Sequence, residues 1–127
     1  MSRTQKQQGP KVLILDVETS PLLGYCWSLW ENNIALNQLH TDWHVLSWAA
    51  KWRGAPVSEI MYMDQRGAKN IENDAKILRG VWELLNEADV VVTQNGVSFD
   101  VKKLNARFIF NGMPPPAPFK NIDTKLL

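Results

Sequence analysis

Apolar positions form short runs in the first half of the chain and follow helical spacing in the second half. A run at residues 11–17 comes after a polar leader and ends in acids, which predicts a strand covered on both faces. Aromatic or alternating segments at residues 24–30, 34–39, 44–52 and 57–63 predict strands of an antiparallel meander. One buried strand is therefore expected to be followed by antiparallel partners.

Helical spacing begins after Asn70. Apolar residues recur on one helical face over residues 71–86, with Asn70 as the expected N-cap and Trp82 in the buried stripe. A β-branched run at residues 89–93 then predicts a buried parallel strand. Residues 122–124 are expected to form a last short strand.

A second helix is expected after the predicted parallel strand, with Ser98 as its N-cap and a stop at Asn111. Its inner stripe is predicted to contain Leu104, Phe108 and Ile109. Basic side chains are expected on its outer face, where they either contact phosphate or remain solvated. These side chains are Lys102, Lys103 and Arg107.

The order of these elements is that of an α/β protein, in which helices pack on a sheet of antiparallel and parallel strands. Neither a repeat nor a linker divides the sequence, so residues 11–127 are expected to form one domain. Residues 1–10 are polar and predict a flexible leader. The basic residues that would either contact phosphate or remain solvated there are Arg3, Lys6 and Lys11.

Composition limits the function classes. A formal charge of +1 over 127 residues signals no strongly basic domain, so nucleic-acid binding would need a local patch. The six Trp residues would fill a core or offer stacking surfaces. The single cysteine, Cys26, excludes an internal disulfide. The sequence has no signal-peptide pattern and no bilayer-spanning apolar run, which predicts a cytoplasmic protein without a membrane partner.

Two acids stand at the end of the first predicted strand. Asp16 and Glu18 are separated by one residue, so their side chains are expected on the same side of the strand. Neighbouring carboxylates repel each other and are costly to desolvate, and a divalent cation would relieve both effects. The alternative is a strand that simply ends in solvated acids.

Asp100 is the third candidate ligand. It lies in the first turn of the second predicted helix, after a strand whose carboxyl end would reach the same sheet edge as Asp16 and Glu18. Three carboxylates would then offer the hard oxygen ligands that suit Mg²⁺ or Mn²⁺. The alternative role of Asp100 is to stabilise the helix dipole at an N-terminus.

These motifs carry a family resemblance. Residues 16–19 (Asp-Val-Glu-Thr) after an apolar strand resemble the first motif of the DEDD (DnaQ-like) 3′–5′ exonucleases, and residues 95–100 (Asn-Gly-Val-Ser-Phe-Asp) resemble the second. Residues 104–107 and 122–124 also resemble the segments that follow. The branch it most resembles is the exonuclease domain of family B polymerases, often encoded by phages. The resemblance covers residues 11–127 and implies an RNase H-like fold.

The resemblance further implies two-metal hydrolysis of phosphodiester bonds. Asp16 would bridge two Mg²⁺ or Mn²⁺ ions, Glu18 would bind the ion that activates water, and Asp100 would hold the second ion partly through water. Thr19 and Asn95 would contact or position the terminal nucleotide. Phe99 would pack under the site, with a plain core role as the alternative.

The sequence departs from the family after the second motif. The family carries a fourth carboxylate on a later helix, preceded by a His or Tyr that orients the nucleophilic water. His40 and His44 precede the second motif, and Asp123, which we interpret as a structural acid, has Phe119 four residues before it. The chain is therefore expected to be a C-terminally truncated domain with poor turnover.

Three functions remain open. The first is a 3′–5′ exonuclease acting on single-stranded DNA or a frayed 3′ end, with RNA also possible. The second is a catalytically incomplete module of the same fold, which binds nucleic acid or completes a partner chain. The third is another RNase H-like nuclease, such as a structure-selective endonuclease. An exposed apolar face would favour self-association or a partner chain, and a phage protein would act in the host cytoplasm.

Overall fold

The computed structural model describes residues 9–127 of the chain. The expected leader, with Arg3 and Lys6, lies almost wholly outside the described residues. Over residues 9–127, no helix has the length and apolar character needed to cross a membrane.

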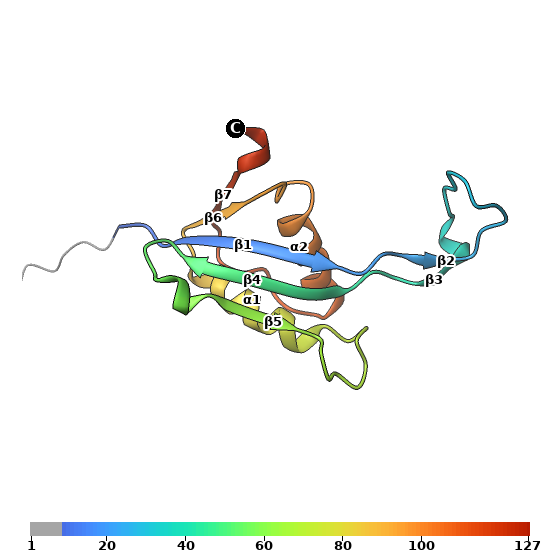
Figure 1. Cartoon of the computed structure of the whole chain (residues 1–127), viewed down its shortest axis with the longest axis horizontal. Coiled ribbons are helices and arrows are strands. Elements are labelled where there is room, and N and C mark those ends of the chain that lie inside the picture. Colours follow the sequence, from blue (N-terminus) through green and yellow to red (C-terminus); the bar gives the residue numbers. More distant parts are fainter. Residues whose placement is uncertain (1–8) are drawn as a thin grey trace, which may run out of the picture.

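A five-stranded sheet of order β5-β4-β1-β6-β7 forms the body of the protein (Figure 1). Its central strand is β1 (Val12–Thr19). β4 (Val45–Trp52) pairs with β1 antiparallel, and β6 (Val90–Thr93) pairs with β1 parallel. β5 (Met61–Asp64) and β7 (Lys120–Asp123) form the two edges. The mixed α/β sheet predicted from the hydrophobic pattern is confirmed.

Two helices cover one face of this sheet. α1 (Ala75–Glu87) and α2 (Asp100–Phe110) lie behind the strands in Figure 1. Their apolar side chains pack against the odd-numbered positions of β1 and the facing positions of β4. Each fully buried Leu, Val or Phe in such a core stabilises the fold by about 1.5–3 kcal/mol. The core includes Leu13, Leu15, Val17, Trp48, Leu78, Val81, Leu104 and Phe108.

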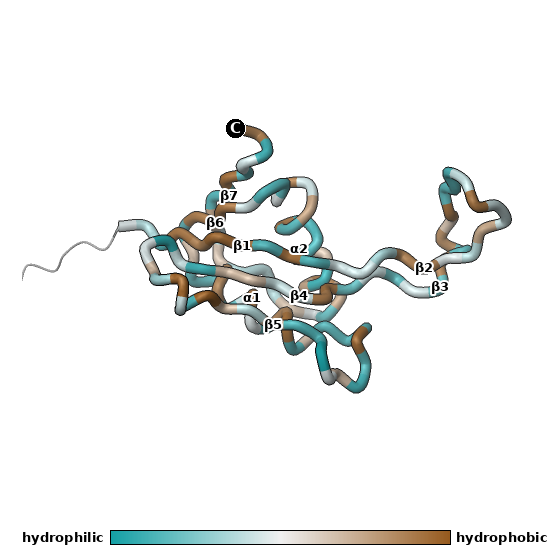
Figure 2. The backbone as a smooth tube through the Cα atoms, viewed as in Figure 1, coloured by the Kyte–Doolittle hydropathy of each residue, from teal (hydrophilic) through white to brown (hydrophobic). Residues whose placement is uncertain are grey.

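The opposite face of β1 is open within the described residues. Ile14 is 46% exposed, and Asp16 and Glu18 on the same face are exposed as well. The prediction of a strand covered on both faces is therefore wrong, because both helices pack on the same side of the sheet. Figure 2 shows β1 hydrophobic at its start and hydrophilic toward its end.

The predicted strands at residues 24–30 and 34–39 are also wrong. β2 (Leu23–Gly24) and β3 (Leu39–Thr41) form a small separate sheet, and a short 3₁₀ turn, η1 (Leu36–Gln38), precedes β3. Aromatic side chains favour strands only where they pack on neighbouring strands, and this segment extends away from the main sheet (Figure 1).

The remaining strands follow the predicted positions more closely. β4 matches the prediction at residues 44–52, whereas residues 57–63 divide into a 3₁₀ turn, η2 (Val57–Glu59), and the start of β5. β7 begins two residues before the predicted strand at 122–124, and the 3₁₀ turn η3 (Thr124–Leu126) follows it.

Helix α1 begins later than predicted. The Asn70 side chain does not cap the helix but accepts a hydrogen bond from the N–H of Glu72, within a turn that precedes α1. The Gln65 side chain donates to the carbonyl of Ile71 at 3.2 Å, which holds this segment outside the helix. Trp82 is only half buried, and its indole N–H donates to a carbonyl of the proline-rich connector.

Three predictions for helix α2 are wrong. Ser98 makes no capping hydrogen bond, and the N-cap position belongs to Phe99. Ile109 is exposed, because it is rotated about 100° from its buried neighbour Phe108. Arg107 is buried, although it was expected on the outer face.

Arg107 is buried because it forms an ion pair with the buried Asp74. Its guanidinium donates to both carboxylate oxygens of Asp74, at 2.8 and 2.9 Å. The same carboxylate accepts the N–H of Val45 and the side-chain amide of Asn111. Burial alone would raise the pKa of Asp74, but Arg107 and Val45 together hold that pKa below its usual range. The pair joins α1, α2 and β4.

Candidate functional site

The two acids of β1 lie side by side on the open face of the sheet. Asp16 and Glu18 are exposed, whereas Val17 between them is buried in the core. Their partners across the antiparallel ladder are the small residues Ala49 and Ser47. Small neighbours leave space above the strand, so both carboxylates are accessible from the open face.

Asp100 reaches the same end of β1 from a distant part of the chain. It is 2% exposed and is the first residue of α2. Its Oδ2 accepts a hydrogen bond from the N–H of Val17 at 2.9 Å, across 83 positions of sequence. β6 pairs with β1 only as far as Ile14, so beyond that point the edge of β1 is free to receive Asp100.

The electrostatics of Asp100 reflect this crowding of acids. Burial raises the pKa of its carboxyl group above the usual value, and the negative charges of Asp16 and Glu18 raise it further. Backbone N–H groups, including that of Val17, oppose the shift without cancelling it. The three carboxylates are thus close enough to interact, and a cation among them would favour the ionised form of Asp100.

The donor set fits a hard divalent cation in chemistry, since all three groups are carboxylates. However, within residues 9–127 no three His, Cys, Asp or Glu side chains are arranged as a ready metal-binding group. The Asp100 carboxylate is directed at the N–H of Val17, while Asp16 and Glu18 extend over the open face. The acids converge on one end of β1 without forming a closed ligand shell.

The segment between β6 and α2 places the other predicted site residues. Asn95 adopts a left-handed conformation with φ of 66°, and its carbonyl accepts the N–H of Phe99 at 2.8 Å. Gly96 passes so close to Thr93 that a Cβ at this position would lie 1.8 Å from the Thr93 hydroxyl. Thr19 follows Glu18 at the end of β1, at an irregularity of the β1–β4 ladder. The structure therefore brings Asn95 and Phe99 together near Asp100 and keeps Thr19 with the acids of β1.

Asp123 anchors this segment. Its carboxylate accepts the backbone N–H groups of Asn95 at 2.7 Å, Val97 at 3.2 Å and Lys125 at 3.0 Å. Burial favours the neutral acid, but these hydrogen bonds outweigh it and lower the pKa of Asp123. The sequence marked Asp123 only as a structural acid at a strand end. Its contact with residues 94–99 depends on β7 lying beside β6, which no local pattern indicates.

The basic residues of α2 divide between two environments. Arg107 is committed to its ion pair, so the prediction that it faces outward is wrong. Lys103 lies with its Nζ 4.0 Å from the ring centre of Trp43, an attractive cation–π geometry. Lys102 is exposed and makes no ion pair within the described residues.

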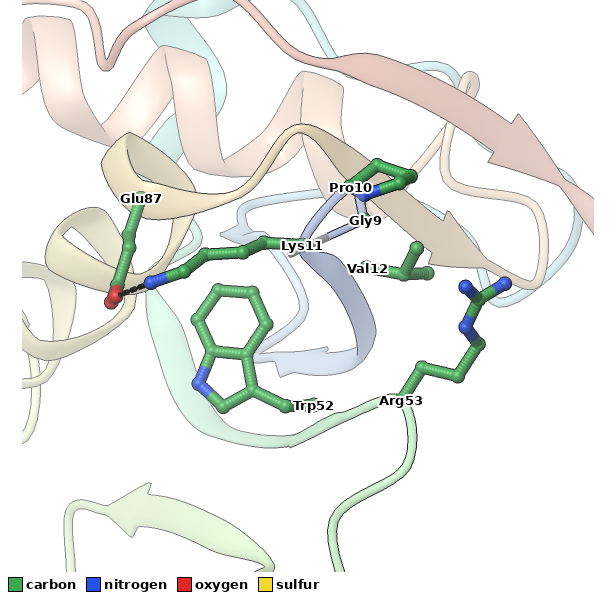
Figure 3. A pocket seen from close by; sticks show the side chains of 7 residues that line it. All are labelled: Gly9, Pro10, Lys11, Val12, Trp52, Arg53 and Glu87. Atoms are coloured by element: carbon green, nitrogen blue, oxygen red, sulfur yellow. Dashed lines mark hydrogen bonds and ion pairs between the residues drawn. The ribbon is translucent and has the colours of Figure 1, made fainter. Parts of the chain in front are cut away.

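A pocket of about 420 Å³ lies at the amino end of β1, away from the acids (Figure 3). Lys11 crosses it, forming an ion pair with Glu87 and lying 5.8 Å from the centre of the Trp52 ring. None of the candidate site residues lines this pocket, so it is separate from the candidate site. It is lined by Gly9, Pro10, Lys11, Val12, Trp52, Arg53 and Glu87.

Comparisons with known proteins support the fold. No protein-family model matches this sequence, and no curated protein matches it. Among solved structures, the family B DNA polymerase of the hyperthermophilic archaeon Pyrobaculum calidifontis is similar, with a TM-score of 0.60 at 18% sequence identity. The match covers 93% of this chain and 16% of the polymerase chain. The α/β fold of this chain thus recurs in part of that polymerase.

Proposed function

We propose that this protein is a metal-dependent 3′–5′ exonuclease of the DEDD type with an RNase H-like fold. The observation that carries the proposal is the hydrogen bond from Val17 to Asp100, which brings a distant carboxylate to the strand end that bears Asp16 and Glu18. The similarity to a DNA polymerase structure supports a nucleic-acid substrate.

The proposed ligands are the three carboxylates. Asp16 and Glu18 would hold Mg²⁺ or Mn²⁺ from the open face, and Asp100 would complete the site from the edge of β1. When bound, the metal would lower the pKa of an attacking water and stabilise the charge that develops at phosphorus. The chain's own contribution is the rigid placement of Asp100, which the N–H of Val17 holds in one orientation.

The proposed substrate is the 3′ end of single-stranded or frayed DNA, with RNA as an alternative. Thr19 and Asn95 would contact or position the terminal nucleotide. Phe99 is half buried, and its N–H bonds the carbonyl of Asn95. It would pack under the site, with a plain core role as the alternative.

Degradation of end-labelled oligonucleotides tests this function. With Mg²⁺ or Mn²⁺ present, 3′-labelled strands should lose their label first, and Asp16→Asn should reduce the rate at least about 100-fold. Glu83→Gln, an exposed acid on α1, is the matched control and should leave the rate unchanged. Internal cuts would instead indicate a structure-selective endonuclease.

The second candidate function is a module that binds nucleic acid without cleaving it. The observation that favours it is the open arrangement of the acids, since no ready metal-binding group exists within residues 9–127. Binding of the labelled strand that persists without any cleavage, under all metal conditions, would select this alternative.

A further inference from the structure

Residues 22–41 form a protruding segment, which we call the aromatic arm. It contains β2, η1 and β3 and extends beyond the end of the main sheet (Figure 1). The arm begins three residues after Thr19, the last residue of β1, and the chain then enters β4. At its base the N–H of Ser20 donates to the carbonyl of His44 at 2.9 Å. The arm is therefore a direct continuation of the strand that carries the acids.

The arm exposes large rings that a folded protein normally covers. Trp27 is 99% exposed, Trp30 83% and Tyr25 68%, whereas Trp48 in the core is buried. Figure 2 shows hydrophobic stretches along the arm although it lies outside the body of the protein. Exposed apolar groups gathered in this way mark a binding surface.

The backbone of the arm is held in place by its own hydrogen bonds. The N–H of Tyr25 donates to the carbonyl of Gln38 at 2.8 Å. The Gln38 side chain accepts the N–H of Ala35 at 2.8 Å and donates to the carbonyl of Tyr25 at 3.1 Å. Gly24 permits a close approach here, because a Cβ would lie 2.5 Å from the side chain of Ile34. The exposed rings thus project from a segment that its own hydrogen bonds hold together.

The charge of the arm limits how it could bind. Residues 22–41 contain one acid, Glu31, and neither Lys nor Arg. Attraction of phosphate groups therefore cannot supply the affinity, whereas stacking of bases on Trp and Tyr rings needs no charge.

We propose that the aromatic arm is a stacking platform for the bases of a single-stranded nucleic acid whose 3′ end lies at the acids of β1. This inference rests on the proposed function and deepens it by assigning a second substrate contact. An apolar protein surface is the competing occupant, because Leu29 and Leu36 are as exposed as the rings. The continuity of the arm with the acidic end of β1 favours the nucleic acid.

Binding of a fluorescent oligodeoxythymidylate in EDTA, followed by anisotropy, tests the arm without cleavage. Trp27→Ala and Trp30→Ala should each weaken binding roughly 5- to 150-fold, the effect of losing one stacked base. Leu29→Ala is the matched control within the arm and should bind like the wild type. The slope of log affinity against log salt should be the same for all variants, since none removes a phosphate contact.

Three results would overturn the arm proposal. The ring variants could bind like the wild type, Leu29→Ala could weaken binding as much as they do, or an abasic strand could bind equally well. The second result would indicate docking of an apolar protein surface. Circular dichroism should show unchanged folding, because substitutions at exposed positions alter stability by less than about 0.5 kcal/mol.

The arm proposal and the proposed function can fail separately. Ring-dependent binding without cleavage in Mg²⁺ or Mn²⁺ would support the arm and refute the nuclease. If the protein cleaves from the 3′ end and the ring variants bind as tightly as the wild type, the nuclease proposal is supported and the arm proposal is refuted.

Discussion

At the residue scale, Asp100 serves two opposed requirements. It is buried and accepts the N–H of Val17, and it would have to be ionised to bind the proposed cation. Burial and the neighbouring charges of Asp16 and Glu18 make its ionisation unfavourable in the folded chain. A site that destabilises the folded protein when no ligand is bound is typical of proteins in which activity is gained at the expense of stability.

Asp100→Asn should therefore stabilise the metal-free protein while abolishing metal-dependent cleavage. Because the folded-state pKa of Asp100 is raised, the wild type loses stability as pH rises from about 3.8 through that pKa. The amide keeps an acceptor for Val17 but carries no charge. Thermal melts in EDTA should show a Tm advantage of the variant that is present at pH 7 and absent in acid. A lower Tm at pH 7 would contradict this account.

Arg107→Met should be strongly destabilising, by roughly 3–5 kcal/mol, because it leaves the buried carboxylate of Asp74 without its partner. The stability that this pair supplies is present above pH 3.8 and is lost as pH falls through the lowered pKa of Asp74. Urea unfolding at pH 7 measures the loss. Lys102→Met on the exposed side of α2 is the control, and an equal effect of both variants would refute the role of the pair.

At the element scale, the segment between β6 and α2 is positioned by a strand that lies beyond it in sequence. Asp123 at the end of β7 fixes the backbone of Asn95 and Val97, and these residues lead directly into Asp100. The placement of the third acid therefore depends on three elements acting together.

Asp123→Ala should loosen this segment and weaken cleavage about 10- to 100-fold, as expected for a residue that orients a ligand from behind. Hydrogen exchange should accelerate at the amides of Asn95 and Val97, which lose their acceptor. Glu72→Gln, an exposed acid before α1, should change neither quantity. Normal exchange at both amides in Asp123→Ala would contradict the anchoring role.

The sequence predicts an element correctly where the spacing of its apolar residues agrees with the side that packs on other elements. β1, β4 and β6 carry apolar runs that pack on helices, and the helical face of α1 is regular from Ile77 onward. The start of α1 could not be predicted, because Ile71 fits the helical spacing while its carbonyl bonds Gln65 instead. Aromatic residues at 24–30 favour strands by propensity, but they have no neighbouring strand to pack on.

The candidate site was predictable in part. Asp16 and Glu18 alternate with a buried residue, so their common face follows from strand geometry alone. No local sequence pattern predicts the burial of Arg107, because that burial depends on Asp74 at the start of the other helix. The spacing of polar and apolar residues along the chain cannot predict an ion pair between distant elements.

At the scale of the whole molecule, the sheet is covered on one side and open on the other within residues 9–127. The open face carries Ile14 and Tyr62 together with the acids of β1. Asp16 and Glu18 are therefore accessible from this open face. Self-association or a partner chain, expected from an exposed apolar face, stays a prediction.

The similarity to the family B polymerase is a similarity of the whole fold, because it covers 93% of this chain. At 18% identity it shows a shared fold, so the roles of Asp16, Glu18 and Asp100 rest on their geometry in this chain. The central claim is that these three carboxylates bind a divalent cation at the end of β1.

Paramagnetic broadening of amide NMR signals by Mn²⁺ tests that claim most directly. Substoichiometric Mn²⁺ should broaden the signals of Asp16, Val17, Glu18 and Asp100 selectively, and Asp16→Asn should abolish the effect. Uniform broadening across the chain, or selective broadening that persists in Asp16→Asn, would contradict the account.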